Sequence, residues 1–399
     1  MSQRFSIVCR WLSRTMLLAA LFVLLFAASE QGVQARPVVT APRPLVAAWL
    51  PTSWDAESAW ASFEAHQDSI DELSPFWYAV QADGGLRAYQ GARDRALVGQ
   101  AHTGGVKVIP TISNEFAPAL LHAILHDPDR RSAHIDAILA ETLAYDYDGI
   151  DIDYENLYAD DRDAFSVFVA ELAAALHARQ KLLTVAVHAK TSAAGTWNGP
   201  AAHDYAAIGA VVDEMRIMTY GWCWATGCST GEPPGPIAPL HWMRGVVEYA
   251  STQVEPARIM LGVHLYGYDW PSSGSAPAVV AATGPGLGPR AGLGRPSAWW
   301  GRAILWEEAQ ELMEQHEATE NWWDSDGFGP VQEPWFTYGD HDVTFANARS
   351  VAVRWRLAQD LGVRGVVVWR LGGEDPAIWD VFGPARYRLY SPYMLLSGK

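Results

Sequence analysis

Short apolar runs recur along the chain and alternate with segments of helical periodicity. Eight runs, most of them rich in Val and Ile, are nearly continuous in apolar character, as in parallel strands buried on both faces. They occupy residues 45–50, 76–80, 106–112, 149–154, 182–188, 214–220, 259–266 and 363–369. Apolar residues at helical spacing follow residue 160 and recur at 242–250 and 346–361. The alternation predicts an α/β fold, a (β/α)8 TIM barrel, with an open doubly wound sheet as the alternative.

The seventh and eighth runs lie too far apart for a single crossover. The intervening sequence is first rich in Gly, Pro and Ala, then helical near 306–316, then aromatic at 322–338. We therefore expect a loop and a small α+β insertion on the barrel rim, at about residues 271–345. A dinucleotide-binding spacing at residues 286–291 follows no predicted strand and contains a proline, so a loop is the better interpretation.

The N-terminus has the composition of an export signal. A basic start with three arginines precedes an uncharged apolar run at residues 16–28. This run is shorter than the roughly 20 residues that a membrane-spanning helix needs. Small residues at the signal-peptidase positions end at Ala35, so we expect a signal peptide at residues 1–35 and a secreted or periplasmic protein. An uncleaved anchor is the alternative.

The charge of the chain narrows the classes of partner. The formal net charge is −16, and removal of residues 1–35 would make it more negative. An acidic chain is repelled by phosphate backbones and anionic bilayers, so we expect neither nucleic acid nor, after signal cleavage, a membrane as partner. A neutral sugar polymer is compatible with this charge. The sequence carries no signal for an oligomeric state.

Two of the three cysteines lie outside the predicted signal. Cys223 and Cys228 are close in sequence and could close a small disulfide loop in an oxidising compartment. Metal binding is the alternative, but no histidine or second cysteine pair lies nearby in sequence to complete a zinc site. We expect a disulfide, and neither a metal nor a cofactor.

The fourth run carries the candidate chemistry. Asp151, Asp153 and Glu155 alternate with two isoleucines and a tyrosine, so period-2 geometry places the three acids on one face. The isoleucines suit the helix layer, which leaves the acids in the barrel lumen. Carboxyls roughly 6.6 Å apart cannot all ionise cheaply at low dielectric, so a proton should be retained or shared. A solvated acidic loop or a calcium site are the alternatives.

Glu155 is the last acid of this alternation. It lies at the carboxyl end of the predicted strand, where the active sites of barrel enzymes lie. If it keeps its proton near neutral pH, it can act as a general acid.

The string DGIDIDYE at residues 148–155 resembles the signature of family 18 glycoside hydrolases, the chitinase-like barrels. Residues 215–220 and 365–369 resemble the sixth and eighth strands of that family. Two further phrases, at residues 235–240 and 261–270, are similar to the bacterial branch that includes spore-cortex and cell-wall glucosaminidases. The resemblance covers roughly residues 44–382 and implies that residues 36–399 form one catalytic barrel.

The resemblance implies a substrate-assisted retaining hydrolysis of β-linked N-acetylglucosamine polymers, in chitin-like chains or the glycan strands of peptidoglycan. Glu155 would protonate the glycosidic oxygen and then serve as base for water. The acetamido carbonyl of the substrate would attack the anomeric carbon, while Asp153 holds the acetamido N–H and Asp151 shares its proton. Tyr220 would donate to the acetamido oxygen. The family needs no cofactor for this chemistry.

Substrate contacts follow from the same resemblance. Trp369 would form the floor under the scissile sugar, because the C–H face of a sugar stacks on an aromatic ring. A core tryptophan is the alternative. Further candidates for substrate binding are Asp148, Trp77, Tyr78, Asn114, Met218, Trp222 and Tyr266, for which core packing is the competing interpretation.

One departure from the family pattern concerns the acetamido pocket. The family usually has Asp or Asn after the sixth-strand tyrosine, whereas Gly221 follows Tyr220 here. Asn114, His188 or Glu374 could substitute for the missing polar group. The departure keeps open a second function, a non-catalytic chitinase-like sugar-binding protein, although retention of the acids and of Tyr220 favours an enzyme. A structural or inhibitory role has no positive signal in the sequence.

Overall fold

The computed structural model describes residues 44–271 and 300–385. The predicted signal at residues 1–35 and the glycine-rich stretch at 286–291 lie outside the described residues. Within these two described ranges, no helix combines the length and the apolar character that a membrane crossing requires.

Eight parallel strands form a closed barrel. They are β1 (Leu45–Leu50), β2 (Glu72–Val80), β5 (Thr111–Ser113), β6 (Gly149–Asp153), β7 (Leu182–His188), β8 (Glu214–Met218), β11 (Ile259–His264) and β17 (Gly365–Trp369). Each pairs with its neighbours in chain order, and β1 pairs with both β2 and β17. Because closure leaves no edge among these strands, the barrel prediction is confirmed and the open sheet is excluded.

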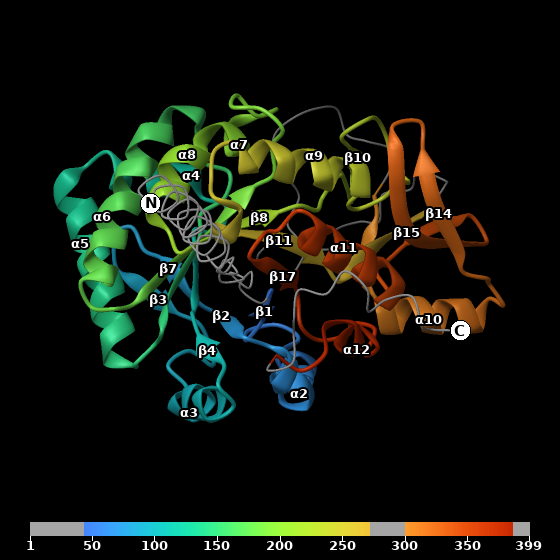
Figure 1. The fold of residues 1–399 in the computed structure, drawn as a ribbon, viewed down its shortest axis with the longest axis horizontal. Coiled ribbons are helices and arrows are strands. Elements are labelled where there is room, and N and C mark those ends of the chain that lie inside the picture. Colours follow the sequence, from blue (N-terminus) through green and yellow to red (C-terminus); the bar gives the residue numbers. More distant parts are fainter. Residues whose placement is uncertain (1–43, 272–299, 386–399) are drawn as a thin grey trace, which may run out of the picture. The chain divides into compact units, whose positions relative to one another are not determined.

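Two short strands and a layer of helices complete the barrel. β3 (Leu86–Ala88) and β4 (Lys107–Val108) pair with β2. The α-helices lie around the strands (Figure 1). They are α2 (Ala56–His66), α3 (Arg95–Thr103), α4 (Pro118–Leu125), α5 (Pro128–Ala144), α6 (Arg162–His177), α7 (Asn198–Ala202), α8 (Tyr205–Val211), α9 (Leu240–Ser251), α11 (Ala348–Asp360) and α12 (Ile378–Phe382), with 3₁₀ turns η1 (Gln67–Ser69), η2 (Ala159–Asp161) and η3 (Pro256–Arg258).

Local chemistry accounts for several helix starts. Asp94 and Asp127 each accept two backbone N–H groups at the first turn of α3 and α5, which satisfies donors that have no partner within the helix. Pro128 follows at the first helical position, where its missing N–H is harmless. The expected buried stripe of α6 is confirmed, since Phe165, Phe168, Val169, Leu172 and Leu176 are all buried.

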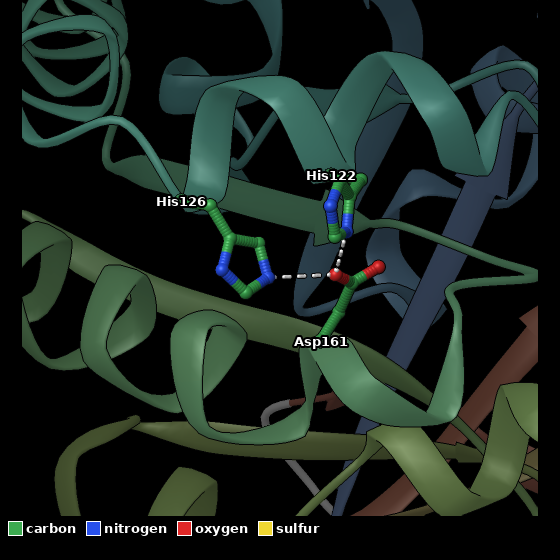
Figure 2. A group of neighbouring side chains, drawn as sticks. All are labelled: His122, His126 and Asp161. Carbon is green, nitrogen blue, oxygen red and sulfur yellow. Dashed lines mark hydrogen bonds and ion pairs between the residues drawn. The ribbon is translucent and has the colours of Figure 1, made fainter.

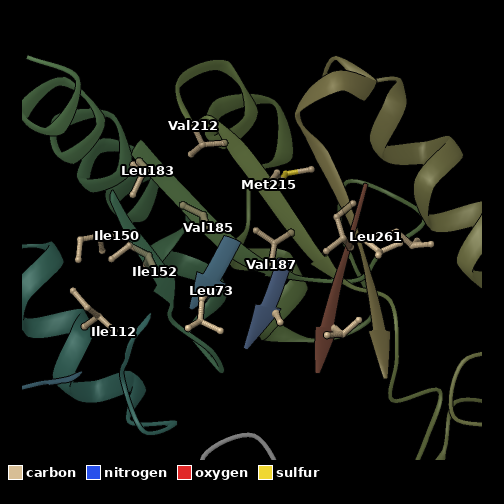
Figure 3. Close-up of a cluster of buried hydrophobic side chains, with 14 of the residues drawn as sticks. Leu73, Ile112, Ile150, Ile152, Leu183, Val185, Val187, Val212, Met215 and Leu261 are labelled. Atoms are coloured by element: carbon tan, nitrogen blue, oxygen red, sulfur yellow. The ribbon is translucent and has the colours of Figure 1, made fainter. Parts of the chain in front are cut away.

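The barrel strands separate two apolar cores. Ile150, Ile152, Leu183 and Val185 face the helices and belong to the larger core, part of which is drawn in Figure 3. Each such side chain contributes about 1.5–3 kcal/mol on burial. Residues of the opposite parity face the lumen, where aromatic rings gather at Trp49, Phe76 and Trp369. One face of each strand therefore packs against the helices, and the other lines the barrel lumen.

The described residues of the insertion between β11 and β17 form a five-stranded antiparallel sheet with one helix. It comprises β12 (Tyr266–Pro271), β13 (Arg302–Leu305), α10 (Trp306–Gln315), β14 (Asn321–Asp326), β15 (Gly329–Tyr338) and β16 (His341–Thr344), in the strand order β13-β12-β16-β15-β14. From the sequence we expected the seventh barrel strand to end at Tyr266, but it ends at His264. Tyr266 starts the insertion sheet, earlier than the expected boundary near residue 271.

Candidate active site

The acids of β6 project into the lumen, as their alternation predicts. Asp151 is fully buried and accepts three hydrogen bonds from three other strands. The donors are Trp49 Nε1 at 2.9 Å, Thr111 Oγ1 at 2.9 Å and Thr184 Oγ1 at 2.5 Å. These bonds satisfy the carboxylate and fix its orientation, so Asp151 is a well-held member of the column.

Asp153 stands above Asp151 in a different environment. Its Oδ1 is buried and has no hydrogen-bond partner among the described residues. Burial, with the neighbouring carboxyls of Glu155 and Asp151, raises the pKa of Asp153 well above its usual range. Asp153 therefore keeps a proton, as the sequence predicts for at least one acid of this column, because its charged form would be poorly solvated.

Glu155 follows the last residue of β6 and reaches the mouth of the barrel. Its side chain is 15% exposed, whereas Asp151 is fully buried. Asn114, which follows β5, fixes the Glu155 peptide from both sides. Its Oδ1 accepts from Glu155 N at 2.9 Å, and its Nδ2 donates to Glu155 O at 2.8 Å. His188 Nε2, at the end of β7, lies 3.7 Å from Glu155 Oε2.

Tyr220 lies two residues beyond β8, the sixth barrel strand, and close to the acid column. Alternation along β8 directs Arg216 inward, and Met218 and Tyr220 follow at the same parity and are partly exposed. Burial, Tyr266 and the three acids raise the pKa of Tyr220 well above its usual range, so the phenol keeps its proton. Its ring meets Tyr266 edge-on at 6.2 Å between centroids. Tyr220 can therefore act only as a hydrogen-bond donor or acceptor near these acids.

Aromatic rings line the lumen beside the acid column. Trp369, the last residue of β17, is 6% exposed and contacts Trp49 and Phe76 edge-on, with centroids 5.8 and 5.0 Å apart. Trp49 also donates its indole N–H to Asp151, which links this aromatic wall to the acids. Phe76 is absent from the substrate-contact candidates of the sequence, although its position two residues after Ser74 on one face of β2 could have indicated it.

Two of the expected substrate contacts lie in the outer core instead. Trp77 and Tyr78 are fully buried among residues that face the helices. The Tyr78 hydroxyl is hydrogen-bonded to Tyr147 Oη at 2.7 Å and donates to Glu141 Oε1 at 2.8 Å. The pairing of β2 with β5 shifts register between Phe76 and Tyr78, so strict alternation fails there and both candidates turn away from the lumen.

Asp148 is also not brought to the site. It immediately precedes β6 and therefore lies at the amino end of the strand, opposite to Glu155. Its Oδ2 accepts from Val108 N at 2.8 Å and lies 2.8 Å from His102 Nε2. These contacts tie neighbouring parts of the barrel base together, which accounts for an acid in this position without a ligand.

The loop after β8 contains the predicted disulfide. Cys223 and Cys228 pair across the hairpin of β9 (Cys223–Trp224) and β10 (Gly227–Cys228), with sulfurs 2.02 Å apart. Trp222, another substrate candidate, is partly exposed and packs on Trp242 with centroids 5.4 Å apart.

Gly221 has a φ of 78°, in the left-handed region. Glycine adopts this region freely, and Asp or Asn adopts it more readily than most residues. The departure from the family pattern thus suits the backbone conformation but omits a side chain. Of the three proposed substitutes, His188 contacts the Glu155 carboxyl and Asn114 its peptide. Glu374 instead accepts from Gly372 N, Ser62 Oγ and Trp379 Nε1, which ties it to its own loop and to the helices α2 and α12.

A second set of buried charges fills the lumen nearer the amino ends of the strands, and the sequence analysis missed it. Arg216 is fully buried and donates to Ser74 Oγ at 2.6 Å and Glu72 Oε2 at 2.9 Å. It also lies 3.3 Å from Glu214 Oε2 and 3.4 Å from Asp151 Oδ1. An arginine inside an otherwise apolar run was the available signal, because such a charge is rarely buried without partners.

Two carboxyls of this set have opposite pKa shifts. Burial would raise the pKa of Glu72, but Arg216 and Lys107 outweigh it and leave this pKa below its usual range. Burial and the nearby Glu72 carboxylate raise the pKa of Glu214 to about 8. Glu72 therefore carries the negative charge and Glu214 the proton near neutral pH.

Comparisons with known proteins agree with this architecture. The family described as glycosyl hydrolases family 18 matches residues 75–374. A cortical fragment-lytic enzyme of Bacillus subtilis is 28% identical over 77% of this chain and 66% of its own length. This chain therefore spans just under two thirds of that relative.

Solved structures give the same result. The spore cortex-lytic enzyme SleL of Bacillus cereus is 26% identical with a TM-score of 0.71, over 86% of this chain and 74% of that one. A chitinase of Chromobacterium violaceum shares the fold, at 24% identity and a TM-score of 0.69, over 85% of this chain and 98% of that one. The family match covers most of the chain and includes the acid column, so the chain belongs to family 18 of the glycosyl hydrolases.

Proposed function

We propose that this protein hydrolyses β-linked N-acetylglucosamine glycans with retention of configuration, using the acetamido group of the substrate as nucleophile. The observation that carries the proposal is Asp153, a buried carboxyl that keeps a proton and leaves one oxygen without a partner in the described structure. Buried polar atoms of this kind call for an explanation, and a ligand that supplies the missing hydrogen bond is one. An acetamido N–H has the required chemistry.

The remaining residues have matching roles in this proposal. Glu155, at the open end of the column, protonates the glycosidic oxygen and then deprotonates the attacking water. Asp151 stays fixed by three donors and favours the protonated form of Asp153. Tyr220, which keeps its phenolic proton, donates to the acetamido oxygen as it attacks the anomeric carbon. Trp369 supplies the flat surface under the sugar.

Asn114 and His188 take supporting roles. Asn114 fixes the peptide of Glu155 through two hydrogen bonds, so it positions the acid rather than touching the sugar. His188 lies 3.7 Å from the Glu155 carboxyl and so offers a polar group in place of the Asp or Asn that the family pattern has after Tyr220. Tyr266 packs edge-on against Tyr220, and Met218 precedes Tyr220 by two residues; both would contact the acetamido methyl group.

We further propose that the substrate is the glycan of peptidoglycan and that the protein is exported. The relatives named cortical fragment-lytic enzyme support the first point. The Cys223–Cys228 disulfide supports the second, because such bonds persist in oxidising compartments. The signal peptide at residues 1–35 remains a prediction, and chitin-like chains are the competing substrate.

The direct test compares residues 36–399 with the Glu155→Gln variant on N-acetylglucosamine oligomers and on peptidoglycan. Wild type should release reducing sugar, and the variant should be about 10²-fold slower or more. Faster release from peptidoglycan than from chitin oligomers supports the proposed substrate. Equal background release by both proteins rejects the enzyme, and tight oligomer binding by both would then replace it with a non-catalytic sugar-binding protein.

A further inference from the structure

Two histidines and an aspartate converge where α4 meets η2. His122 lies in α4, His126 follows the end of α4, and Asp161 ends η2. Figure 2 shows both imidazole rings directed at one carboxylate oxygen. His122 Nδ1 lies 2.6 Å and His126 Nε2 lies 3.0 Å from Asp161 Oδ1. None of these residues has a role in the proposed hydrolysis.

The donor set is that of a transition-metal site. One ligand atom from each residue lies within 4.8 Å of the other two. Histidines four residues apart lie on one face of a helix, and two imidazoles with a carboxylate are a common zinc ligand set. The nitrogens lie 2.6 and 3.0 Å from Oδ1, whereas ligands of one tetrahedral zinc ion lie about 3.4 Å apart, so the rings would move outward by less than about 1 Å to admit the metal.

The burial of the three side chains fits this use. Asp161 is fully buried, whereas His122 and His126 are 48% and 44% exposed, so an ion can enter from solvent. The second oxygen, Asp161 Oδ2, accepts from Tyr158 N at 3.2 Å. A backbone donor on the non-ligating oxygen orients a carboxylate ligand, as the outer contacts of metal sites do.

The position of the cluster gives it a consequence for the active site. His122 and His126 belong to the unit that follows Asn114, and Asp161 belongs to the unit that follows Glu155. Asn114 and Glu155 are themselves joined by two hydrogen bonds. The Asn114–Glu155 hydrogen bonds already join these two βα units. A metal bound by His122, His126 and Asp161 would join them again, at residues that follow Asn114 and Glu155 in sequence.

We propose that His122, His126 and Asp161 bind Zn²⁺, which ties the segment after β5 to the segment after β6. Water would fill the remaining coordination position. Zinc is favoured over Mg²⁺ or Ca²⁺ because imidazole ligands suit zinc and those ions prefer oxygen ligands. The role is structural, and it does not depend on the proposed hydrolytic function.

The test uses protein produced from the full chain without a polyhistidine tag and treated with a chelator, which is then removed. Titration with Zn²⁺ should show one site by calorimetry, with a dissociation constant in the micromolar range or tighter. Zinc at about 100 times that constant should raise the melting temperature by roughly 3 °C. Cobalt, used as a visible probe, should give the absorption of a tetrahedral or five-coordinate site.

The variants His122→Gln and His126→Gln should each weaken zinc binding by about tenfold or more and abolish the rise in melting temperature. Both histidines are half exposed, so these variants should fold. The matched control is His177→Gln. His177 Nε2 lies 2.9 Å from Asp213 Oδ2, and Asp213 also accepts a backbone N–H, but among residues 44–271 and 300–385 no second histidine completes a metal-ligand group with them.

The control variant should bind zinc as the wild type does. No saturable binding below about 100 times the expected micromolar constant would overturn the proposal and leave the cluster as a hydrogen-bonded triad. Binding that survives both His122→Gln and His126→Gln would overturn it equally, because the metal would then lie elsewhere.

Discussion

The barrel lumen contains two layers of buried acids that differ in how their charge is balanced. Nearer the amino ends of the strands, Arg216 lies among Glu72, Glu214 and Ser74 and contacts each of them. Nearer the carboxyl ends, Asp153 has a buried oxygen with no hydrogen-bond partner among the described residues. The two layers are joined by Asp151, which touches Arg216 at 3.4 Å.

The difference separates structural from functional charge. Burying a charge is costly unless it is paired and hydrogen-bonded, and the layer around Arg216 meets that requirement. The layer around Asp153 does not meet it, and the pKa of Asp153 is raised so that the carboxyl is protonated and uncharged. Buried groups with strongly shifted pKa values cluster at catalytic sites, where a substrate can supply the missing hydrogen bond. Stability should therefore depend on the first layer, and activity on the second.

The largest expected effect comes from breaking the balanced layer. Arg216→Met leaves the carboxyls around it without their cation, and removing one partner of a buried ion pair costs about 3–5 kcal/mol. Urea unfolding should show this loss. Arg244→Met is the control, because Arg244 is an exposed helix residue facing Glu248, and it should change stability by less than about 0.5 kcal/mol. A loss of under about 1 kcal/mol for Arg216→Met would contradict the structural role of this layer.

The second prediction concerns the unbalanced layer. Asp153→Asn keeps the shape of the side chain and cannot ionise, so the unfolding free energy at pH 7 should not fall. Turnover of N-acetylglucosamine oligomers should fall by about 10²-fold, as when one preorganised polar group of an active site is removed. Kinetics and urea unfolding of the same preparation measure the two effects. A variant that loses stability but keeps turnover would reverse the assignment of the two layers.

A smaller effect is expected at Asn114, which acts on the second layer through Glu155. Asn114→Ala removes both hydrogen bonds to the Glu155 peptide, so kcat should fall by roughly tenfold, about 1.4 kcal/mol, with KM little changed. Asn321→Ala, at an exposed asparagine of the insertion, is the control and should leave kcat unchanged. If KM rises while kcat stays constant, Asn114 contacts the substrate rather than positioning the acid.

The last prediction is a pH dependence of stability from the first layer. The pKa of Glu214 is raised to about 8 in the folded protein, against an ordinary value of 4.5. The folded state therefore binds more protons between these pH values, and stability falls as the pH rises from about 4.5 to about 8. The lowered pKa of Glu72 affects stability only below about pH 4.5, so it does not offset this slope.

Glu214→Gln cannot ionise and can still accept a hydrogen bond from Arg216, so it should flatten this slope in unfolding curves measured across the range. The remaining slope would include the contribution of Asp153, whose raised pKa has the same sign. A variant as steep as the wild type would show that Glu214 does not hold the proton.

The sequence predicted the barrel well because each strand buries both faces and so reads as a continuous apolar run. It predicted the acid column for a local reason, since alternation along one strand fixes which side chains share a face. It failed at Trp77 and Tyr78 because a register shift in β2 interrupts that alternation, and the shift arises from pairing with β5. The substrate-contact prediction for Asp148 was wrong for a different reason, because Asp148 lies at the amino end of β6 and the acid column ends at the carboxyl end.

Tertiary structure alone decided the partners of each charge. Arg216 and Glu72 are 144 residues apart, Asn114 and Glu155 are 41 apart, and His122 and Asp161 are 39 apart. Closing the barrel brings such residues together across the lumen or between adjacent βα units, and no local pattern encodes which will meet. The sequence by itself thus determined the strands, the face of the acids and the family signature. The closed barrel decided which acids are neutralised by a cation and which must keep a proton.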